Sequence, residues 1–174
     1  PDFILHFAAI SFVEEKNKNL MYDVNVFGTQ NLLECIIENN LNPEKVIIVS
    51  SAAVYGEQNT NILSEDLCPN PINHYGYSKY ISERITSTFF SKLKIIVVRP
   101  FNYPGSAQSE KFIIPKIVSH FSENKSSIAL GNINVSREFN YIDDIAHSYL
   151  DLLNCESKSI LVNICSGKSI NINY

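Results

Sequence analysis

The sequence predicts an α/β protein with a doubly wound parallel sheet, and three observations support this fold class. Short apolar runs rich in β-branched residues, at 46–49 and 95–98, are typical of parallel strands covered on both faces. Longer stretches with apolar residues at helical spacing, at 20–40 and 75–90, lie after and between these runs. Strand-like and helix-like segments therefore alternate along the chain, which indicates right-handed βαβ connections.

Length and composition narrow the class of protein. With 174 residues, the chain is long enough for one domain with a substantial core. The net charge of -4 argues against nucleic acid or an anionic membrane surface as the main partner. No apolar run approaches the roughly 20 residues that span a bilayer. The four cysteines form no CxxC pair, which predicts reduced thiols in the cytoplasm rather than a disulfide framework or a metal site.

The first half of the chain gives the clearest periodicity. The paired asparagines Asn39 and Asn40 end the first helix, and Pro69 and Pro71 mark a long loop. Long ordered loops in compact domains are often functional. The expected elements are a strand at 2–9, a loop at 12–19, a helix at 20–40, a strand at 46–49, a loop at 57–74 and a helix at 75–90.

The second half is expected to complete the sheet. Here Arg99-Pro100 is expected to break the strand at 95–98, and a Gly/Pro/Ser loop follows at 102–110. The remaining expected elements are a helix at 113–121, short strands at 128–130 and 138–142, a helix at 143–153 and a last strand at 160–164.

Small and polar residues follow three of the predicted strands, at 6–9, 50–51 and 99–102. In open parallel sheets, ligands bind at the carboxyl ends of the strands. The sequence therefore predicts a binding site at this edge.

Ser51, Tyr75 and Lys79 are candidates for a proton-transfer site. Tyr75 and Lys79 are four residues apart and share one helix face. A neighbouring ammonium is expected to lower the phenol pKa from about 10, so that Tyr75 could exchange a proton with a sugar hydroxyl or a ketone. Ser51 would hold the same oxygen. A Tyr–Lys pair alone carries little information, but its position after a strand-end hydroxyl and a long loop gives it weight.

Six segments in this order resemble the extended short-chain dehydrogenase/reductases, the NAD(P)-dependent sugar-nucleotide epimerase, dehydratase and reductase group. The resemblance covers essentially the whole chain. It implies a Rossmann-like sheet and part of the small C-terminal substrate-binding subdomain. The segments are His6-Phe7-Ala8-Ala9, Asn25 to Thr29, Ser51 to Gly56, Tyr75 to Lys79, Arg99-Pro100-Phe101-Asn102, and Arg137 to Asp144.

The resemblance implies NAD or NADP as cofactor and a nucleotide sugar as substrate. It implies a catalytic triad of Ser51, Tyr75 and Lys79; cofactor contacts from Phe7, Ala8, Ala9, Val24, Tyr75, Lys79 and Phe101; and substrate contacts from Ser51, Asn102 and Arg137. Structural roles are expected for three further residues: His6 as a satisfied histidine, Asn25 as a brace between a helix and the strand edge, and Asp144 as a helix cap or first-turn acid.

The reaction is narrowed by two alanines. Related 4,6-dehydratases carry an acidic residue after the catalytic hydroxyl, where this chain has Ala52 and Ala53, so dehydration is disfavoured. The segment 99–115 is similar to GDP-4-keto-6-deoxymannose reductases. The resemblance thus implies reduction of a 4-keto-6-deoxy nucleotide sugar, with nucleotide-sugar 4-epimerisation as the alternative. A GDP-mannose 4,6-dehydratase-like enzyme and a non-catalytic binding or interface module are further alternatives.

The family's glycine-rich phosphate loop has no counterpart among the six glycines. We therefore expect a single incomplete domain. Residues 1–102 would form the Rossmann part from about the fourth strand onward, and 103–174 would mix sheet and substrate-binding elements. Weak or absent cofactor binding is expected for the 174 residues alone.

The helices at 20–40 and 75–90 resemble those that pair across homodimers in this family. Burial in the monomer core would explain the apolar candidates equally well. These are Leu32, Ile36, Ile81, Ile85 and Phe89.

Overall fold

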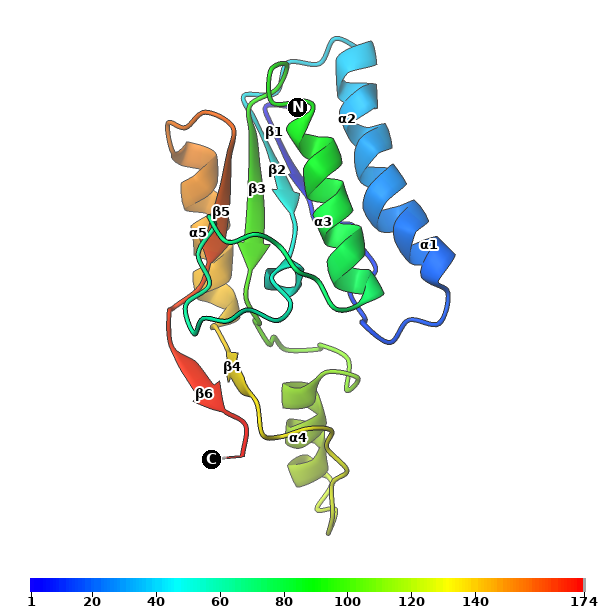
Figure 1. Cartoon of the computed structure of the whole chain (residues 1–174), viewed down its shortest axis with the longest axis vertical. Helices are drawn as coiled ribbons and strands as arrows, with labels where there is room; N and C mark the ends of the chain where they lie inside the picture. The colour runs from blue at the N-terminus through cyan, green and yellow to red at the C-terminus, as the bar shows by residue number, and fades with distance from the viewer. Residues whose placement is uncertain (174) are drawn as a thin grey trace.

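A parallel four-stranded sheet forms the centre of the molecule, with strand order β1-β2-β3-β5 (Figure 1). This computed structural model describes residues 1–173. The strands run from Phe3–His6 (β1), Lys45–Val49 (β2), Ile95–Pro100 (β3) and Ile160–Ile164 (β5). All three neighbouring pairs are parallel, which confirms the predicted fold class.

Helices cover both faces of this sheet (Figure 1). Alternate residues of β2 show the two layers: Val46 and Ile48 pack in a cluster with α2 residues, whereas Ile47 and Val49 pack with α5 residues. Both central strands, β2 and β3, are buried along their full length, as the continuous apolar runs predicted. On one side lie α1 (Lys18–Tyr22), α2 (Gly28–Glu38) and α3 (His74–Ser87), and on the other lies α5 (Ile142–Asn154).

The predicted helix at 20–40 is interrupted by a π-helical turn, Asp23–Phe27, between α1 and α2. Asn25 lies in this turn and is 1% exposed. Its side chain bonds to both backbone groups of Ile10 and donates to the Ser78 hydroxyl at 2.9 Å. The expected bracing role of Asn25 is thus confirmed. Because π-turns add a residue to the helical period, apolar spacing did not reveal this one.

Helix α3 buries a polar face instead of the apolar stripe that the sequence predicted. Its buried side chains are small or charged, while Ile81 is 39% exposed. Of the expected interface residues, Ile36 is only 1% exposed, and Leu32 and Phe89 pack against the same core cluster. Packing in the monomer core thus accounts for these three, which was the alternative left open for them, and the homodimer itself stays a prediction. The buried residues of α3 are Gly76, Ser78, Lys79, Ser82, Glu83 and Thr86.

Strand β3 continues through Arg99 and Pro100, which were expected to break it. Both residues stay in parallel register with β5, opposite Asn163 and Ile164. An ion pair with Glu83 compensates the charge of the Arg99 side chain, so the charge does not force the chain out of the sheet.

A second, smaller group of elements extends from one end of the sheet (Figure 1). It contains α4 (Ile113–Ser122) and the antiparallel pair β4 (Ser136–Glu138) and β6 (Ser169–Asn171). The strand expected at 128–130 is wrong: this segment has no strand pairing, and its Ala129 carbonyl accepts from Lys116 Nζ. The strand expected at 138–142 is wrong except for Glu138: β4 runs from Ser136 to Glu138, Phe139 forms only an isolated bridge, and α5 begins at Ile142. The pairing of β6 with β4 was not anticipated.

Candidate active site

The carboxyl ends of the strands meet at one edge of the sheet, as predicted. His6 is in register with Ile48, Val49 with Val98, and Pro100 with Ile164. The three polar strand ends therefore face the same space. No helix in the described part of the chain is long and apolar enough to cross a membrane.

Ser51 begins a tight turn directly after β2. It caps the short 3-10 helix Ala52–Val54, and its Oγ accepts a hydrogen bond from Ala53 N at 3.1 Å. The start of α3 approaches this turn closely at Gly76. A Cβ there would lie 2.7 Å from the Ala53 carbonyl oxygen and 2.9 Å from Pro71 Cβ, so only glycine permits the approach. This close approach places Tyr75, the residue before Gly76, beside Ser51.

Tyr75 lies in the first turn of α3, whose N-cap Asn73 accepts from Gly76 N at 2.9 Å. Burial raises the pKa of the Tyr75 phenol, and a side-chain hydrogen bond with Ser51 lowers it in part. The nearby phenol of Tyr103 raises it further. The expected lowering of this pKa by Lys79 is wrong for this structure, because loss of solvation outweighs the opposing effects.

Lys79 lies one turn further along α3 and is 6% exposed. Its Nζ donates to the Val49 carbonyl at 2.7 Å, which ties α3 to the last residue of β2. Burial lowers the pKa of Lys79 to about 8, and the Glu83 carboxylate partly opposes this. A neutral amine is therefore accessible at mildly alkaline pH. The three predicted catalytic residues come together at the carboxyl edge.

The residues expected to contact a dinucleotide also lie at or near this edge. Phe7 is 49% exposed and packs edge-on against Tyr149, with ring centroids 4.9 Å apart. Ala8, which follows, is exposed, and Ala9 is partly buried. Val24 is partly buried in the π-helical turn, and the Phe101 ring lies 6.4 Å from that of Tyr55. The exposed ring of Phe7 and the exposed Ala8 are thus open to a ligand at this edge, and their contact with a dinucleotide stays a prediction.

The two residues expected at the substrate differ in how they are held. Asn102 pairs with Phe139 in an isolated bridge, and its side-chain amide donates to the Glu138 carbonyl at 2.9 Å. Arg137 lies on β4 and is exposed, and its Nη1 donates to the Ser136 carbonyl at 3.0 Å. The two residues thus lie on paired segments, but the Asn102 amide is already engaged with the backbone.

His6 and Asp144 have the environments that structural roles require. His6 Nε2 lies 3.1 Å from Thr29 Oγ1, and burial together with the charge of Lys79 lowers its pKa. Asp144 lies in the first turn of α5, where a carboxylate is favoured by the helix dipole.

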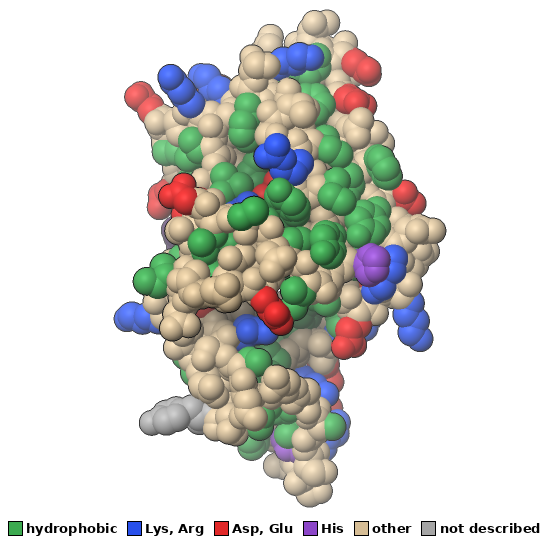
Figure 2. All heavy atoms as spheres, viewed as in Figure 1, with side chains coloured by type: hydrophobic (Ala, Val, Ile, Leu, Met, Phe, Trp, Pro, Cys, Tyr) green, Lys and Arg blue, Asp and Glu red, His purple; other side chains and the backbone are tan. Residues whose placement is uncertain are grey.

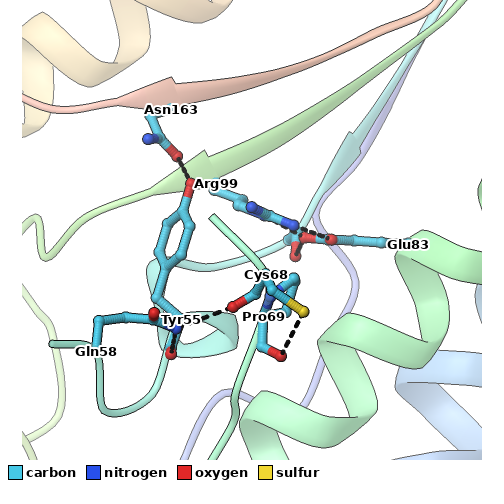
Figure 3. A network of polar contacts seen from close by, with 8 residues as sticks. Tyr55, Gln58, Cys68, Pro69, Glu83, Arg99 and Asn163 are labelled. Carbon is cyan, nitrogen blue, oxygen red and sulfur yellow. Dashed lines mark hydrogen bonds and ion pairs between the residues drawn. The ribbon is translucent and has the colours of Figure 1, made fainter. Parts of the chain in front are cut away.

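Four residues near the site were missed. Tyr103 and Tyr149 lie near Tyr75, and the Tyr149 hydroxyl is buried without a hydrogen-bond partner in residues 1–173. Glu83 and Arg99 form a buried ion pair beneath the site (Figure 3). For this pair a signal existed: an arginine that directly follows the buried run at 95–98 needs an internal partner.

Comparison with known proteins places these features in a family. GDP-6-deoxy-D-talose 4-dehydrogenase of Aggregatibacter actinomycetemcomitans is 40% identical over 167 residues, which cover 96% of this chain and 57% of that protein. GDP-6-deoxy-D-mannose reductase of Pseudomonas aeruginosa is 29% identical and covers 97% of this chain and 59% of that protein. Other relatives are named as 4-epimerases or 4,6-dehydratases.

The solved structure of RMD from Pseudomonas aeruginosa, complexed with NADPH, superposes with a TM-score of 0.90 at 28% identity. It covers 99% of this chain and 61% of that chain, so this chain spans less than two thirds of the length of the proteins that it matches. The profile described as GDP-mannose 4,6 dehydratase matches residues 1–174. The chain belongs to the GDP-mannose 4,6-dehydratase family.

Proposed function

We propose that the protein is an NAD(P)-dependent oxidoreductase that acts on a nucleotide sugar. The proposed reaction is reduction of the 4-keto group of the sugar to a 4-hydroxyl. The observation that carries this proposal is the meeting of Ser51, Tyr75 and Lys79 at the carboxyl edge of the sheet. The relatives named as a GDP-6-deoxy-D-talose 4-dehydrogenase and a GDP-6-deoxy-D-mannose reductase support a GDP-linked 6-deoxy sugar as substrate.

The chain's own residues would manage the proton. When bound, the reduced nicotinamide supplies the hydride. Tyr75, whose pKa is raised by burial, stays protonated at neutral pH and can donate its proton to the carbonyl oxygen of the sugar. Ser51 hydrogen-bonds the same oxygen and fixes its position. Lys79, anchored on Val49, supports the phenolate that forms.

Dehydration is disfavoured because Ala52 and Ala53 place no acid or base beside Ser51. Both alanines lie in the 3-10 turn that Ser51 caps. A 4-epimerase needs only the same three residues, and relatives named as 4-epimerases keep it as a second candidate.

The decisive experiment tests Tyr75→Phe in protein expressed from the whole reading frame. We expect turnover of GDP-4-keto-6-deoxymannose with NADPH to fall by at least about 10²-fold, since general acid catalysis typically contributes this much. Tyr80→Phe, at a partly buried position of the same helix outside the candidate site, is the matched control and should keep wild-type rates. Wild-type turnover by Tyr75→Phe would refute the mechanism. Turnover of a 4-hydroxy epimer pair without added NADPH would favour the epimerase.

We also propose that the protein is a cytoplasmic homodimer joined through α1, the π-helical turn and α3. An apolar patch of four side chains lies exposed on this face, and Figure 2 shows apolar side chains gathered over these helices. The four cysteines are free, as expected in a reducing compartment. A monomer in sedimentation analysis at micromolar concentration would refute the dimer. The patch consists of Leu20 (45% exposed), Phe27 (53%), Tyr77 (47%) and Ile81 (39%).

A further inference from the structure

Two buried cations, Lys79 and Arg99, lie near one buried carboxylate, Glu83, next to the candidate site. Lys79 and Glu83 lie one turn apart on α3 and are 6% and 5% exposed, and Arg99 near the end of β3 is 3% exposed. Charged side chains are almost never buried unless they are paired. The choice of the cation that pairs with Glu83 therefore decides the electrostatic environment of Lys79.

Arg99 takes both oxygens of Glu83. Its Nε donates to Oε1 at 2.9 Å and its Nη2 donates to Oε2 at 2.7 Å, which is the bidentate geometry that an arginine favours (Figure 3). The Ser50 hydroxyl also donates to Oε1. The guanidinium is held from the other side by the Tyr55 ring, 4.7 Å from Arg99 Cζ, and the Tyr55 hydroxyl donates to Asn163 Oδ1 at 2.7 Å.

Lys79 is left with a backbone partner. Its Nζ donates to the Val49 carbonyl, and within residues 1–173 no carboxylate forms an ion pair with it. Val49 and Ser50 immediately precede Ser51. The bonds from Lys79 and Glu83 thus fasten α3 to the two residues that lead into the Ser51 turn.

We propose that Arg99 and Glu83 form a positioning unit for the candidate active site: by holding the Glu83 carboxylate against β3, Arg99 prevents it from pairing with Lys79 and leaves Lys79 bonded to the β2 backbone. The unit touches neither substrate nor cofactor. It acts through Lys79 and through the segment that ends in Ser51. The proposal concerns how the proposed proton-transfer site is tuned, and so rests on that proposed function.

The pKa of Lys79 agrees with a Glu83 carboxylate that pairs with Arg99 and not with Lys79. Lys79 has a pKa of about 8, because burial lowers it more than Glu83 raises it. The other titratable group that interacts with Lys79 is His6 from β1, whose pKa the Lys79 charge lowers. A direct Lys79–Glu83 ion pair would instead favour the ammonium.

The test measures the proton affinity of Lys79 by NMR titration of ¹³Cε-labelled lysine, with Lys79→Met used to assign the signal. Glu83→Gln removes the one carboxylate and should weaken proton binding by Lys79 about tenfold. Arg99→Gln frees Glu83 to pair with Lys79 and should strengthen it about tenfold. In the double variant Glu83→Gln/Arg99→Gln, the increase in the proton affinity of Lys79 should disappear. Glu38→Gln, exposed at the end of α2, should change nothing.

A merely structural role gives a different pattern, because loosened packing hydrates Lys79 and strengthens proton binding in every variant. A rise in Glu83→Gln, or a rise in Arg99→Gln that persists in the double variant, would overturn the proposal. Glu83→Gln is the variant at risk of misfolding, since Arg99 would stay buried without a carboxylate. In that case the Arg99→Gln and double variants alone decide the question.

Activity provides a separate readout. In Glu83→Gln the alkaline limb of the kcat profile should move to lower pH, with KM for the nucleotide sugar nearly unchanged. The NMR titration requires no turnover. If the proposed reaction is wrong, the titration still reports the proton affinity of Lys79. If the positioning unit is wrong, the expected shifts in proton affinity are absent, while Tyr75→Phe still lowers turnover.

Discussion

Two regions of this molecule differ in how far their side chains are buried. The sheet region consists of the four-stranded sheet with its covering helices, and the peripheral segment consists of α4, β4 and β6. In the sheet region, β2 and β3 are buried on both faces, and even two charged side chains of α3, Lys79 and Glu83, are buried. In the peripheral segment of α4, β4 and β6, helix α4 has no buried residue, and its Val118 and Phe121 are 62% and 72% exposed. The candidate proton-transfer residues thus lie on a rigid frame, whereas Arg137 lies where few internal contacts define the geometry.

The largest expected difference between the two regions concerns apolar packing. Ile96→Ala, at a side chain that is 1% exposed in β3, should lower the free energy of unfolding by about 2–5 kcal/mol, because it leaves a cavity in a two-sided core. Val118→Ala in α4 should change it by less than about 0.5 kcal/mol. Urea unfolding of both variants measures this contrast. Equal losses would show that α4 has a buried partner in solution.

The sequence predicted the frame better than it predicted the details of the site. Continuous apolar runs identified the buried strands, because a two-sided core demands them, and strand-end residues located the carboxyl edge. The polar inner face of α3 was not predicted, since close approach at Gly76 and internal ion pairing replace apolar packing there. The β4–β6 pair joins segments more than thirty residues apart, and no local pattern encodes that pairing. The segment at 128–130 has strand-like composition but no neighbouring strand.

The second contrast uses glycines. Gly76→Ala should destabilise the protein by about 1–3 kcal/mol, because the new Cβ would overlap the Ala53 carbonyl and Pro71. It should also move Tyr75 away from Ser51 and reduce turnover more than it reduces stability. Gly131→Ala in the peripheral segment has open space around the new Cβ and should be nearly neutral. Thermal unfolding and initial rates of both variants test this. Full activity in Gly76→Ala would show that close contact between α3 and the Ser51 turn is dispensable.

A third expected effect, comparable to that of Gly76→Ala, is a pH dependence of stability that arises only from the sheet region. Lys79 binds its proton less tightly in the native state, with a pKa of about 8 against an ordinary value of 10.5. Between these values the unfolded chain holds more protons, so the free energy of unfolding should rise as pH increases, by about 2 kcal/mol from pH 7.5 to 9.5. Tyrosines and cysteines also ionise toward the upper end of this range and oppose the rise, so the contribution of Lys79 is the difference between the wild type and a Lys79 variant.

Lys79→Met should remove this rise, while Lys168→Met, an exposed lysine beside β6, should retain it. Urea unfolding midpoints across the pH range provide the measurement, with the denaturant slope checked for constancy. A wild-type slope in Lys79→Met would mean that Lys79 is hydrated in solution and that α3 is less tightly bound to β2 than the Val49 contact indicates. The tightly packed region would then end at the carboxyl ends of the strands. The candidate site would belong to the loosely packed part of the molecule, together with α4.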